Sequence, residues 1–198
     1  MTLSIKNIQV SVSVYFAAVI TFALLFAPNG SALPALLCCI LHEIGHLTVI
    51  YLSGGRVRKV SLGPYGMRID PIRTLKISQK KEIIISLAGP FVNIVLLTAG
   101  IILKNPIIMR INLVLCIFNL LPVGRTDGYS ALYNTLSLFF IESKVKDVLK
   151  VISTSFLIII YIFGIIIFAK TKYNFTLLAV AVYMTVINTT GILKAESI

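Results

Sequence analysis

Six apolar runs, each close to the length that crosses a lipid bilayer, constrain the fold of this chain more than any other feature. They lie at 8–27, 33–52, 83–103, 106–122, 151–169 and 174–193. A helix of about twenty apolar residues spans the hydrocarbon core of a membrane. Of the 198 residues, 58% are hydrophobic. The sequence therefore predicts an all-α polytopic membrane protein with about six transmembrane helices, organised as a single domain over residues 1–198.

Two of these runs are weaker candidates than the other four. The run at 106–122 contains Arg110 and Asn112 and ends on a proline. The run at 8–27 could be a signal peptide, because a lysine precedes it and small residues follow it. Its apolar region is longer than a signal core, so we expect a retained membrane anchor.

The basic residues predict an orientation in the membrane. The net charge is +11, and placing the N-terminus in the cytosol puts 14 of the 18 Lys and Arg residues on the cytosolic side. The positive-inside rule favours this arrangement, with both termini cytosolic. Orientation and contact with anionic lipids account for the basic charge, so we expect no nucleic-acid partner.

The stretch HEIGH, residues 42–46, places two histidines and a glutamate inside an apolar run. Such residues are costly in hydrocarbon unless they line a polar cavity, bind an ion or carry out chemistry. Residues four apart share one helix face, so His42 and His46 can bind one zinc ion while Glu43 reaches a water molecule beside it. The alternative is a pair of hydrogen-bonded structural histidines. The chain has only two histidines, and both belong to this motif, which favours metal binding.

A catalytic zinc site usually has three protein ligands, and Asp127 is the candidate for the third. It is one of seven Asp and Glu residues and follows the segment FNLLPVGRT. Pro122 should end the helix before it, and Gly124 and Gly128 loosen the backbone on either side. With the predicted orientation, the runs at 33–52 and 106–122 both end on the cytosolic side, so Asp127 can meet the histidines there. The alternative is an ordinary turn or helix-cap residue.

Three motifs in this order resemble those of the site-2 protease family of intramembrane zinc metalloproteases: HEIGH, then AGPFVN at 88–93, then NLLPVGRTDG at 119–128. The plan looks most like the branch that includes the bacterial sporulation protease acting on a membrane-bound pro-sigma factor. The resemblance covers a catalytic core at about 33–130 and leaves the helices at 151–193 without assigned chemistry. It implies that His42, His46 and Asp127 hold one Zn²⁺ per chain.

The resemblance also implies roles for other residues. Glu43 would be the catalytic acid and base, and Asn93 would face the site and donate a hydrogen bond to the developing oxyanion. Asn119 and Pro122 would shape the approach of Asp127. Thr126 stands where many members have Leu, a departure that leaves the ligand intact. We expect no PDZ or nucleotide-sensing CBS domain, and hence no regulation through one.

The implied activity is hydrolysis of a peptide bond within or near a transmembrane segment of another protein. Candidate substrates include membrane-tethered transcription regulators, and an inhibitory membrane partner or a homo-oligomer is a further possibility. The resemblance implies a bacterial plasma membrane, with the active site towards the cytosol. Two other classes stay open: a metal transporter or sensor, and an inactive scaffold that binds membrane segments. The glutamate beside His42 and the complete set of His, Glu, His and Asp favour the protease.

The segment at 54–70 predicts a small membrane-associated β-hairpin after the second helix. Apolar residues alternate on either side of Gly63-Pro64, which suggests two short strands about a turn. We hypothesise that Val60 and Leu62 belong to an edge that pairs with an extended substrate segment. The alternative is a basic hairpin resting on the lipid surface.

Overall fold

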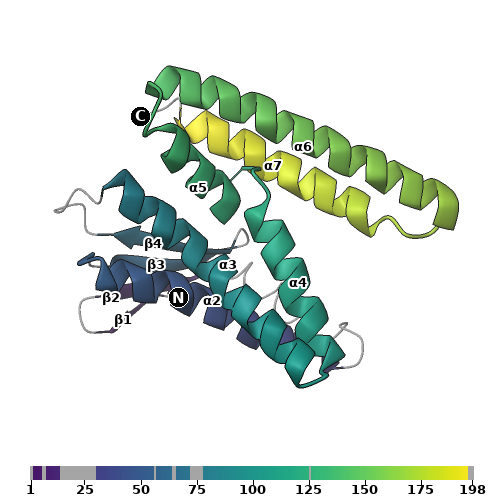
Figure 1. The fold of residues 1–198 in the computed structure, drawn as a ribbon, viewed down its shortest axis with the longest axis horizontal. Helices are drawn as coiled ribbons and strands as arrows, with labels where there is room; N and C mark the ends of the chain where they lie inside the picture. The colour runs from purple at the N-terminus through teal and green to yellow at the C-terminus, as the bar shows by residue number, and fades with distance from the viewer. Residues whose placement is uncertain are drawn as a thin grey trace. The chain divides into compact units, whose positions relative to one another are not determined.

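The computed structural model describes residues 2–5, 8–13, 30–55, 57–63, 66–71, 78–124 and 126–195. In this part of the chain the helices are α2 (Ala32–Leu52), α3 (Gln79–Ile102), α4 (Pro106–Leu120), α5 (Asp127–Leu136), α6 (Glu142–Thr171) and α7 (Thr176–Ala195). The strands are β1 (Thr2–Ile5), β2 (Ile8–Val12), β3 (Val57–Gly63) and β4 (Gly66–Pro71). Figure 1 shows these elements along the chain. They form two compact units, Met1–Cys116 and Ile117–Ile198, and the division falls within α4.

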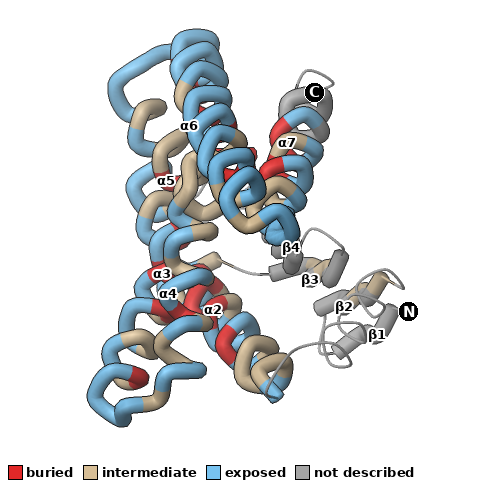
Figure 2. Tube along the Cα trace, turned by 90° about the vertical axis from the view of Figure 1, so that its right-hand side faces the viewer, coloured by how far each residue is buried: buried red, intermediate tan, exposed pale blue. Residues whose placement is uncertain are grey.

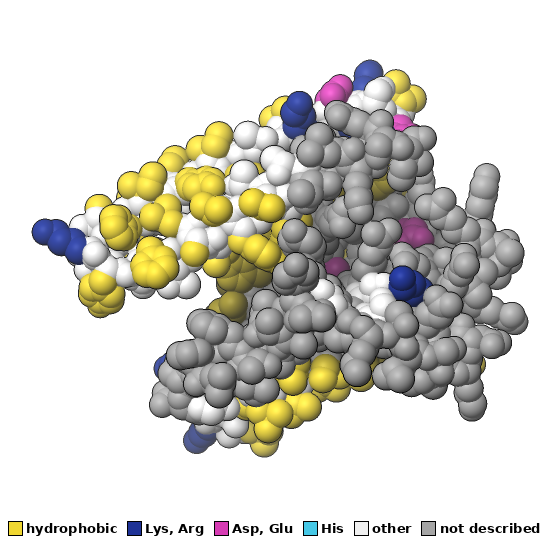
Figure 3. Space-filling view, turned by 180° about the vertical axis from the view of Figure 1, so that it is seen from behind, with side chains coloured by type: hydrophobic (Ala, Val, Ile, Leu, Met, Phe, Trp, Pro, Cys, Tyr) yellow, Lys and Arg dark blue, Asp and Glu magenta, His cyan; other side chains and the backbone are white. Residues whose placement is uncertain are grey.

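Among the described residues, three helices are long and apolar enough to cross a membrane: α2, α3 and α6. They correspond to the predicted spans at 33–52, 83–103 and 151–169. Most residues of each span are not buried inside the protein, and the buried share of the α6 window is only 17% (Figure 2). The exposed side chains are largely Ile, Leu, Val and Phe, and Figure 3 shows hydrophobic groups over much of the described surface in that view. These helices are those of an integral membrane protein.

The other predicted spans correspond to the structure only in part. The run at 106–122 falls on the shorter helix α4, Pro106–Leu120. The run at 174–193 falls on α7, which has 20 residues and whose apolar stretch includes Thr176–Thr189. The expectation of a helix beginning at residue 8 is wrong, because Ile8–Val12 forms β2. Its sequence IQVSV alternates apolar and polar residues, which is the strand period that a count of hydrophobic residues overlooks. The rest of that run, from residue 14 onwards, lies outside the described residues.

The strands form one four-stranded sheet in the order β1-β2-β3-β4. β1 pairs with β2 and β3 with β4 in antiparallel fashion, whereas β2 and β3 are parallel. The β3 and β4 strands lie where the sequence predicts two strands about Gly63-Pro64. The sheet is larger than the expected hairpin because the N-terminal strands β1 and β2 extend it. Across the parallel pair of β2 and β3, the Ser11 hydroxyl donates a hydrogen bond to the Ser61 hydroxyl at 3.0 Å.

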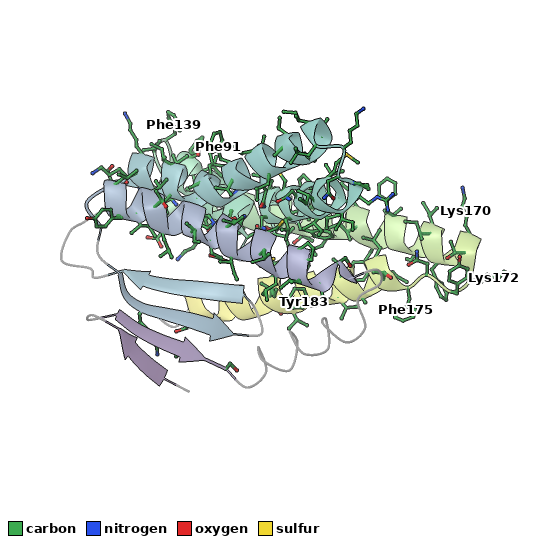
Figure 4. The ribbon with its side chains drawn as sticks, turned by 90° about the horizontal axis from the view of Figure 1, so that it is seen from below. Phe91, Phe139, Lys170, Lys172, Phe175 and Tyr183 are labelled. Carbon is green, nitrogen blue, oxygen red and sulfur yellow. The ribbon has the colours of Figure 1, made fainter. Side chains whose placement is uncertain are left out.

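In the first unit, α2 and α3 pack side by side along their length (Figure 4). Gly45 makes this close approach possible, since a Cβ there would lie 2.7 Å from Val92 Cγ2 and 2.9 Å from the Ala88 carbonyl oxygen. The α4 helix joins the pair through Asn112, which is fully buried and donates to Cys38 Sγ at 3.3 Å. This packing brings the polar faces of α2 and α3 together.

In the second unit, α6 and α7 run side by side (Figure 1). Gly164 of α6 lets them approach, because a Cβ there would lie 2.8 Å from Leu178 Cδ2. At the turn between them, Lys170 and Lys172 lie together with Phe175 (Figure 4), and Tyr173 is 79% exposed. Aromatic rings and long cationic side chains are typical of the membrane–water interface, which suits this turn.

Candidate metal centre

The two histidines of the HEIGH motif lie one helical turn apart on the buried face of α2. His42 is 5% exposed and His46 is 7% exposed. Their rings meet edge to face, with centroids 4.9 Å apart and an interplanar angle of 80°. The two Nε2 atoms are 3.2 Å apart. The predicted pairing of the histidines on one helix face is therefore what the structure shows.

The orientation of both rings is set by one face of α3. The His46 Nδ1 atom lies 2.7 Å from the carbonyl oxygen of Ile85, and the His42 Nδ1 atom lies 2.9 Å from Nδ2 of Asn93. Gly89 lies between these two contacts in the sequence, so the three residues follow one another at intervals of four and share a face of the helix. The α3 helix thus holds each imidazole by the nitrogen that faces away from the other ring.

The contact with Ile85 fixes the proton of one imidazole. A carbonyl oxygen can only accept a hydrogen bond, so Nδ1 of His46 carries the proton and donates it. Nε2 of His46 is then a lone-pair donor for a metal.

Gly89 leaves space against the inward-facing nitrogens. A Cβ on Gly89 would overlap Nε2 of His46 and would come within 2.6 Å of Nε2 of His42. Any side chain here would thus fill the space in front of both lone pairs. The sequence places Gly89 inside the AGPFVN motif but assigns it no role. The signal that could have revealed its role is a glycine in the helix predicted to pack against the two histidines.

The histidine pair fits a zinc ion by two independent observations. Two nitrogens bound at roughly 2.0–2.1 Å to one tetrahedral ion lie about 3.3 Å apart, close to the 3.2 Å between the Nε2 atoms. The absence of a side chain on Gly89 leaves that position open. Glu43 follows His42 directly, is half-buried, and lies outside the buried face formed by His42 and His46. It is therefore placed beside the pair and not within it.

Asp127 is the first residue of α5, in the second unit. The preceding helix α4 ends at Leu120, two residues before Pro122, as the sequence predicts. Thr126 is the N-cap of α5: its hydroxyl accepts from the Tyr129 backbone N–H at 3.3 Å and donates to the Leu121 carbonyl. The partial positive charge of a helix N-terminus favours an anionic carboxylate at this position.

Two glycines and one buried side chain, that of Val123, hold the loop before Asp127. A Cβ on Gly128 would overlap the backbone of Leu120, and Gly124 has a φ of 67°, which other residues rarely adopt. Val123 is fully buried and packs in a cluster with Leu157 of α6 and Met184 of α7. The loop is thus anchored to helices that the sequence analysis left without a role.

One hydrogen bond adds to this anchor. Ser153 of α6, only 1% exposed, donates to the carbonyl of Pro122 at 2.7 Å. Pro122 therefore contributes both the helix break and an acceptor.

Asn119, on the last turn of α4, is half-buried. Near Asp127, burial is the main cause that raises the pKa of Tyr129. The neighbouring Tyr133 adds to this rise and Lys146 opposes it, so the phenol stays neutral at neutral pH.

The structure revises the expectation for Val60 and Leu62. Both lie in β3, which is an inner strand of the sheet: Val60 pairs with Val10 on one side and Ile69 on the other. An inner strand has no unpaired edge to offer a substrate, because both neighbours already use its backbone groups. Of these two paired strands, β4 is the one that lies at the edge of the sheet.

Comparison with known proteins finds a similar fold among solved structures and no match by sequence. No protein-family model matches the chain, and a search of curated proteins by sequence finds no match. Among solved structures, the chain is similar to the site-2 protease from Methanocaldococcus jannaschii, with a TM-score of 0.66 and 22% sequence identity. The similarity covers 96% of this chain and 94% of the other. The chain therefore has the fold of a site-2 protease over nearly its whole length.

Proposed function

We propose that this protein is an intramembrane zinc metalloprotease that cleaves a peptide bond within or near a transmembrane segment of another membrane protein. The observation that carries the proposal is the histidine pair of α2, with Nε2 atoms 3.2 Å apart and both rings held by α3. The similarity in fold to a site-2 protease supports it and extends over both units. The finer resemblance to the sporulation branch rests on the motifs alone.

One zinc ion per chain would be held by His42, His46 and Asp127. These residues offer two imidazole nitrogens and a carboxylate oxygen, a donor set that catalytic zinc accepts. Zinc in this position would lower the pKa of a water molecule and polarise the peptide carbonyl. Thr126, Gly128 and Ser153 hold the backbone around Asp127, so the third ligand comes from a positioned helix start.

Glu43 is the proposed general base and acid. Its carboxylate takes the proton of the attacking water and returns it to the leaving amine. The HExxH spacing supports this role, because it puts the carboxylate next to one ligand without adding it to the ligand face. A transmembrane substrate hides its carbonyls in helical hydrogen bonds, so the bond that is cleaved must lie where the helix unwinds. The edge strand β4 is the proposed place for an extended substrate segment.

The membrane supplies the setting for this chemistry. The basic residues favour cytosolic termini and an active site on the cytosolic side. The exposed apolar faces of the helices suit contact with lipid and with a substrate helix. The proposed partners are thus membrane lipids and a membrane-anchored protein, with tethered transcription regulators as one substrate class.

The test compares protein N-termini in host cells that carry wild type, Glu43→Gln or Glu142→Gln. Glu142 pairs with Lys146 on the exposed start of α6, so its variant is the matched control. We expect new N-termini near membrane-segment boundaries with wild type and Glu142→Gln, and none with Glu43→Gln, while all three purified proteins contain zinc. Identical maps for wild type and Glu43→Gln would contradict proteolysis and favour a metal transporter or a scaffold.

A further inference from the structure

Asn93 contacts a proposed metal ligand on the side that faces away from the metal. Its side chain is fully buried in α3, and Nδ2 lies 2.9 Å from Nδ1 of His42. The same face of α3 supplies the Ile85 carbonyl to Nδ1 of His46. Each histidine is thus held at Nδ1, His46 by a backbone carbonyl and His42 by a side-chain amide.

We propose that Asn93 is a positioning residue that fixes the ring orientation and tautomer of His42, instead of a donor to the oxyanion. This inference rests on the proposed metal site. Partners on the second nitrogen of a ligating imidazole set its tautomer and orientation, and their loss typically weakens metal binding 10- to 100-fold.

An asparagine can serve His42 in two states because its amide has a donor and an acceptor end. Without a metal, Asn93 Nδ2 donates to Nδ1 of His42, and Nε2–H of His42 can donate to Nε2 of His46 across 3.2 Å. The proton on Nδ1 of His46 then goes to Ile85. Each imidazole nitrogen therefore has a partner in one consistent chain of hydrogen bonds.

Metal binding requires the other end of the amide. When Nε2 of His42 binds the metal, its proton must lie on Nδ1, which then needs an acceptor. Rotation of the Asn93 amide by half a turn presents Oδ1 to that proton. In the described part of the chain, Oδ1 of Asn93 is buried without a hydrogen-bond partner, so this rotation gives it one. The amide orientation thus follows the state of the metal site.

Asn112 provides a matched control in the same unit. It is also an asparagine with no exposed surface, and its Oδ1 likewise has no hydrogen-bond partner within the described residues. Its amide donates to Cys38 Sγ and to the Ile108 carbonyl, not to a histidine. Replacing Asn112 by Leu therefore removes the same kind of buried side-chain amide as replacing Asn93, and it leaves the contacts of both imidazole rings in place.

The experiment measures zinc affinity by chelator competition on the full-length protein in detergent, for wild type, Asn93→Leu, Asn93→Asp and Asn112→Leu. We expect about a 10- to 100-fold loss of affinity for Asn93→Leu. Asn112→Leu should bind as wild type does. Asn93→Asp should bind more tightly than wild type, because a carboxylate accepts the Nδ1 proton in the metal-bound state without any rotation of an amide.

A second readout separates positioning from general packing. Asp can only accept from Nδ1–H, so the metal-free Asn93→Asp protein loses the chain of hydrogen bonds between the rings and should melt at a lower temperature than the metal-free wild type. Zinc should then raise its melting temperature by more than it raises that of wild type. An equal zinc-induced rise in the two proteins would contradict the rotating amide.

Other outcomes would also overturn the inference. Wild-type affinity in Asn93→Leu, with a fall in kcat alone, would make Asn93 a donor to the reacting carbonyl. Equal losses in the Leu variants of Asn93 and Asn112 would mean a packing effect. If Asn93→Leu cannot be purified, a tenfold weaker binding of zinc by Asn93→Asp would refute the proposal. Failure of wild type itself to bind zinc would instead refute the proposed function and this inference with it.

Discussion

The α2–α3 pair and the α6–α7 pair are both apolar helix pairs that approach each other at a glycine, yet they serve different purposes. In the first pair, a polar face is buried and its groups make hydrogen bonds across the interface, from Ile85 and Asn93 to the histidines. In the second pair, the interface is mostly apolar. Ser153 of α6 donates to the Pro122 carbonyl, and Leu157 and Met184 pack on Val123, so the pair holds a loop. Burying polar groups is costly unless they are paired, so the first pair is specialised for a site and the second for support.

This difference predicts that similar glycine substitutions in the two pairs have different effects. Gly89→Ala should reduce zinc affinity by more than 100-fold, a loss larger than that expected from one orienting hydrogen bond, because the new Cβ overlaps the nitrogens that bind the metal. Gly164→Ala, which pushes against Leu178, should lower the melting temperature and leave zinc binding unchanged. Chelator competition and thermal melting of both variants measure this. Normal zinc binding by Gly89→Ala would show that the space at Gly89 is not the metal position.

Val123→Ala tests the apolar anchor of the loop. Val123 is fully buried against Leu157 and Met184, so its truncation leaves a cavity and should cost about 1–3 kcal/mol. We expect a lower melting temperature together with reduced cleavage. If Val123→Ile keeps cleavage and Val123→Ala does not, the loss of cleavage in Val123→Ala results from lost packing. Unchanged melting and cleavage in Val123→Ala would mean that the loop is held elsewhere.

Thr126→Ala tests the cap before Asp127. Loss of an N-cap typically costs about 0.5–2 kcal/mol, and Thr126 also donates to the Leu121 carbonyl. We expect weaker zinc binding because the start of α5 carries the proposed third ligand. Thr126→Ser keeps the hydroxyl and should restore it. Equal zinc affinities for Thr126→Ala and Thr126→Ser would show that the capping hydroxyl does not determine the position of Asp127.

Ser153→Ala should have the smallest effect. It removes the hydrogen bond to the Pro122 carbonyl, which should cost about 0.5–1.5 kcal/mol. The control is Ser155→Ala, two residues along α6, where the hydroxyl donates only within its own helix, to Val151, and is exposed. A modest loss of cleavage at raised temperature is expected for Ser153→Ala alone. Equal behaviour of the two variants would leave Val123 as the main anchor.

The sequence predicts much of the membrane helices because their signal is long and local. The spans corresponding to α2, α3 and α6 follow from hydrophobic length, and the end of α4 follows from Pro122. The sheet was only half anticipated. β2 is a five-residue strand at the start of an apolar run, and a strand within hydrophobic sequence is readily mistaken for the beginning of a helix.

The histidine pair was also predictable, since a spacing of four fixes a common helix face. What holds the pair was not. The Ile85 carbonyl has no sequence signature, and the contacts of Gly89 and Asn93 depend on the register between α2 and α3. Ser153 contacts a carbonyl 31 positions away, a relation that only the tertiary fold creates. Val60 and Leu62 were misassigned because the pairing of β3 with an N-terminal strand is equally non-local.

The hydrogen bond from His46 to the Ile85 carbonyl means that alanine scanning cannot detect one of the two contacts that orient the histidine rings. Every residue has the same backbone oxygen, so replacing the Ile85 side chain leaves the acceptor in place. A scan of α3 would single out Asn93 and suggest that only His42 is supported. The support of His46 would emerge only from a change to the main chain itself, such as an ester in place of the amide that follows Ile85, which weakens that carbonyl as an acceptor.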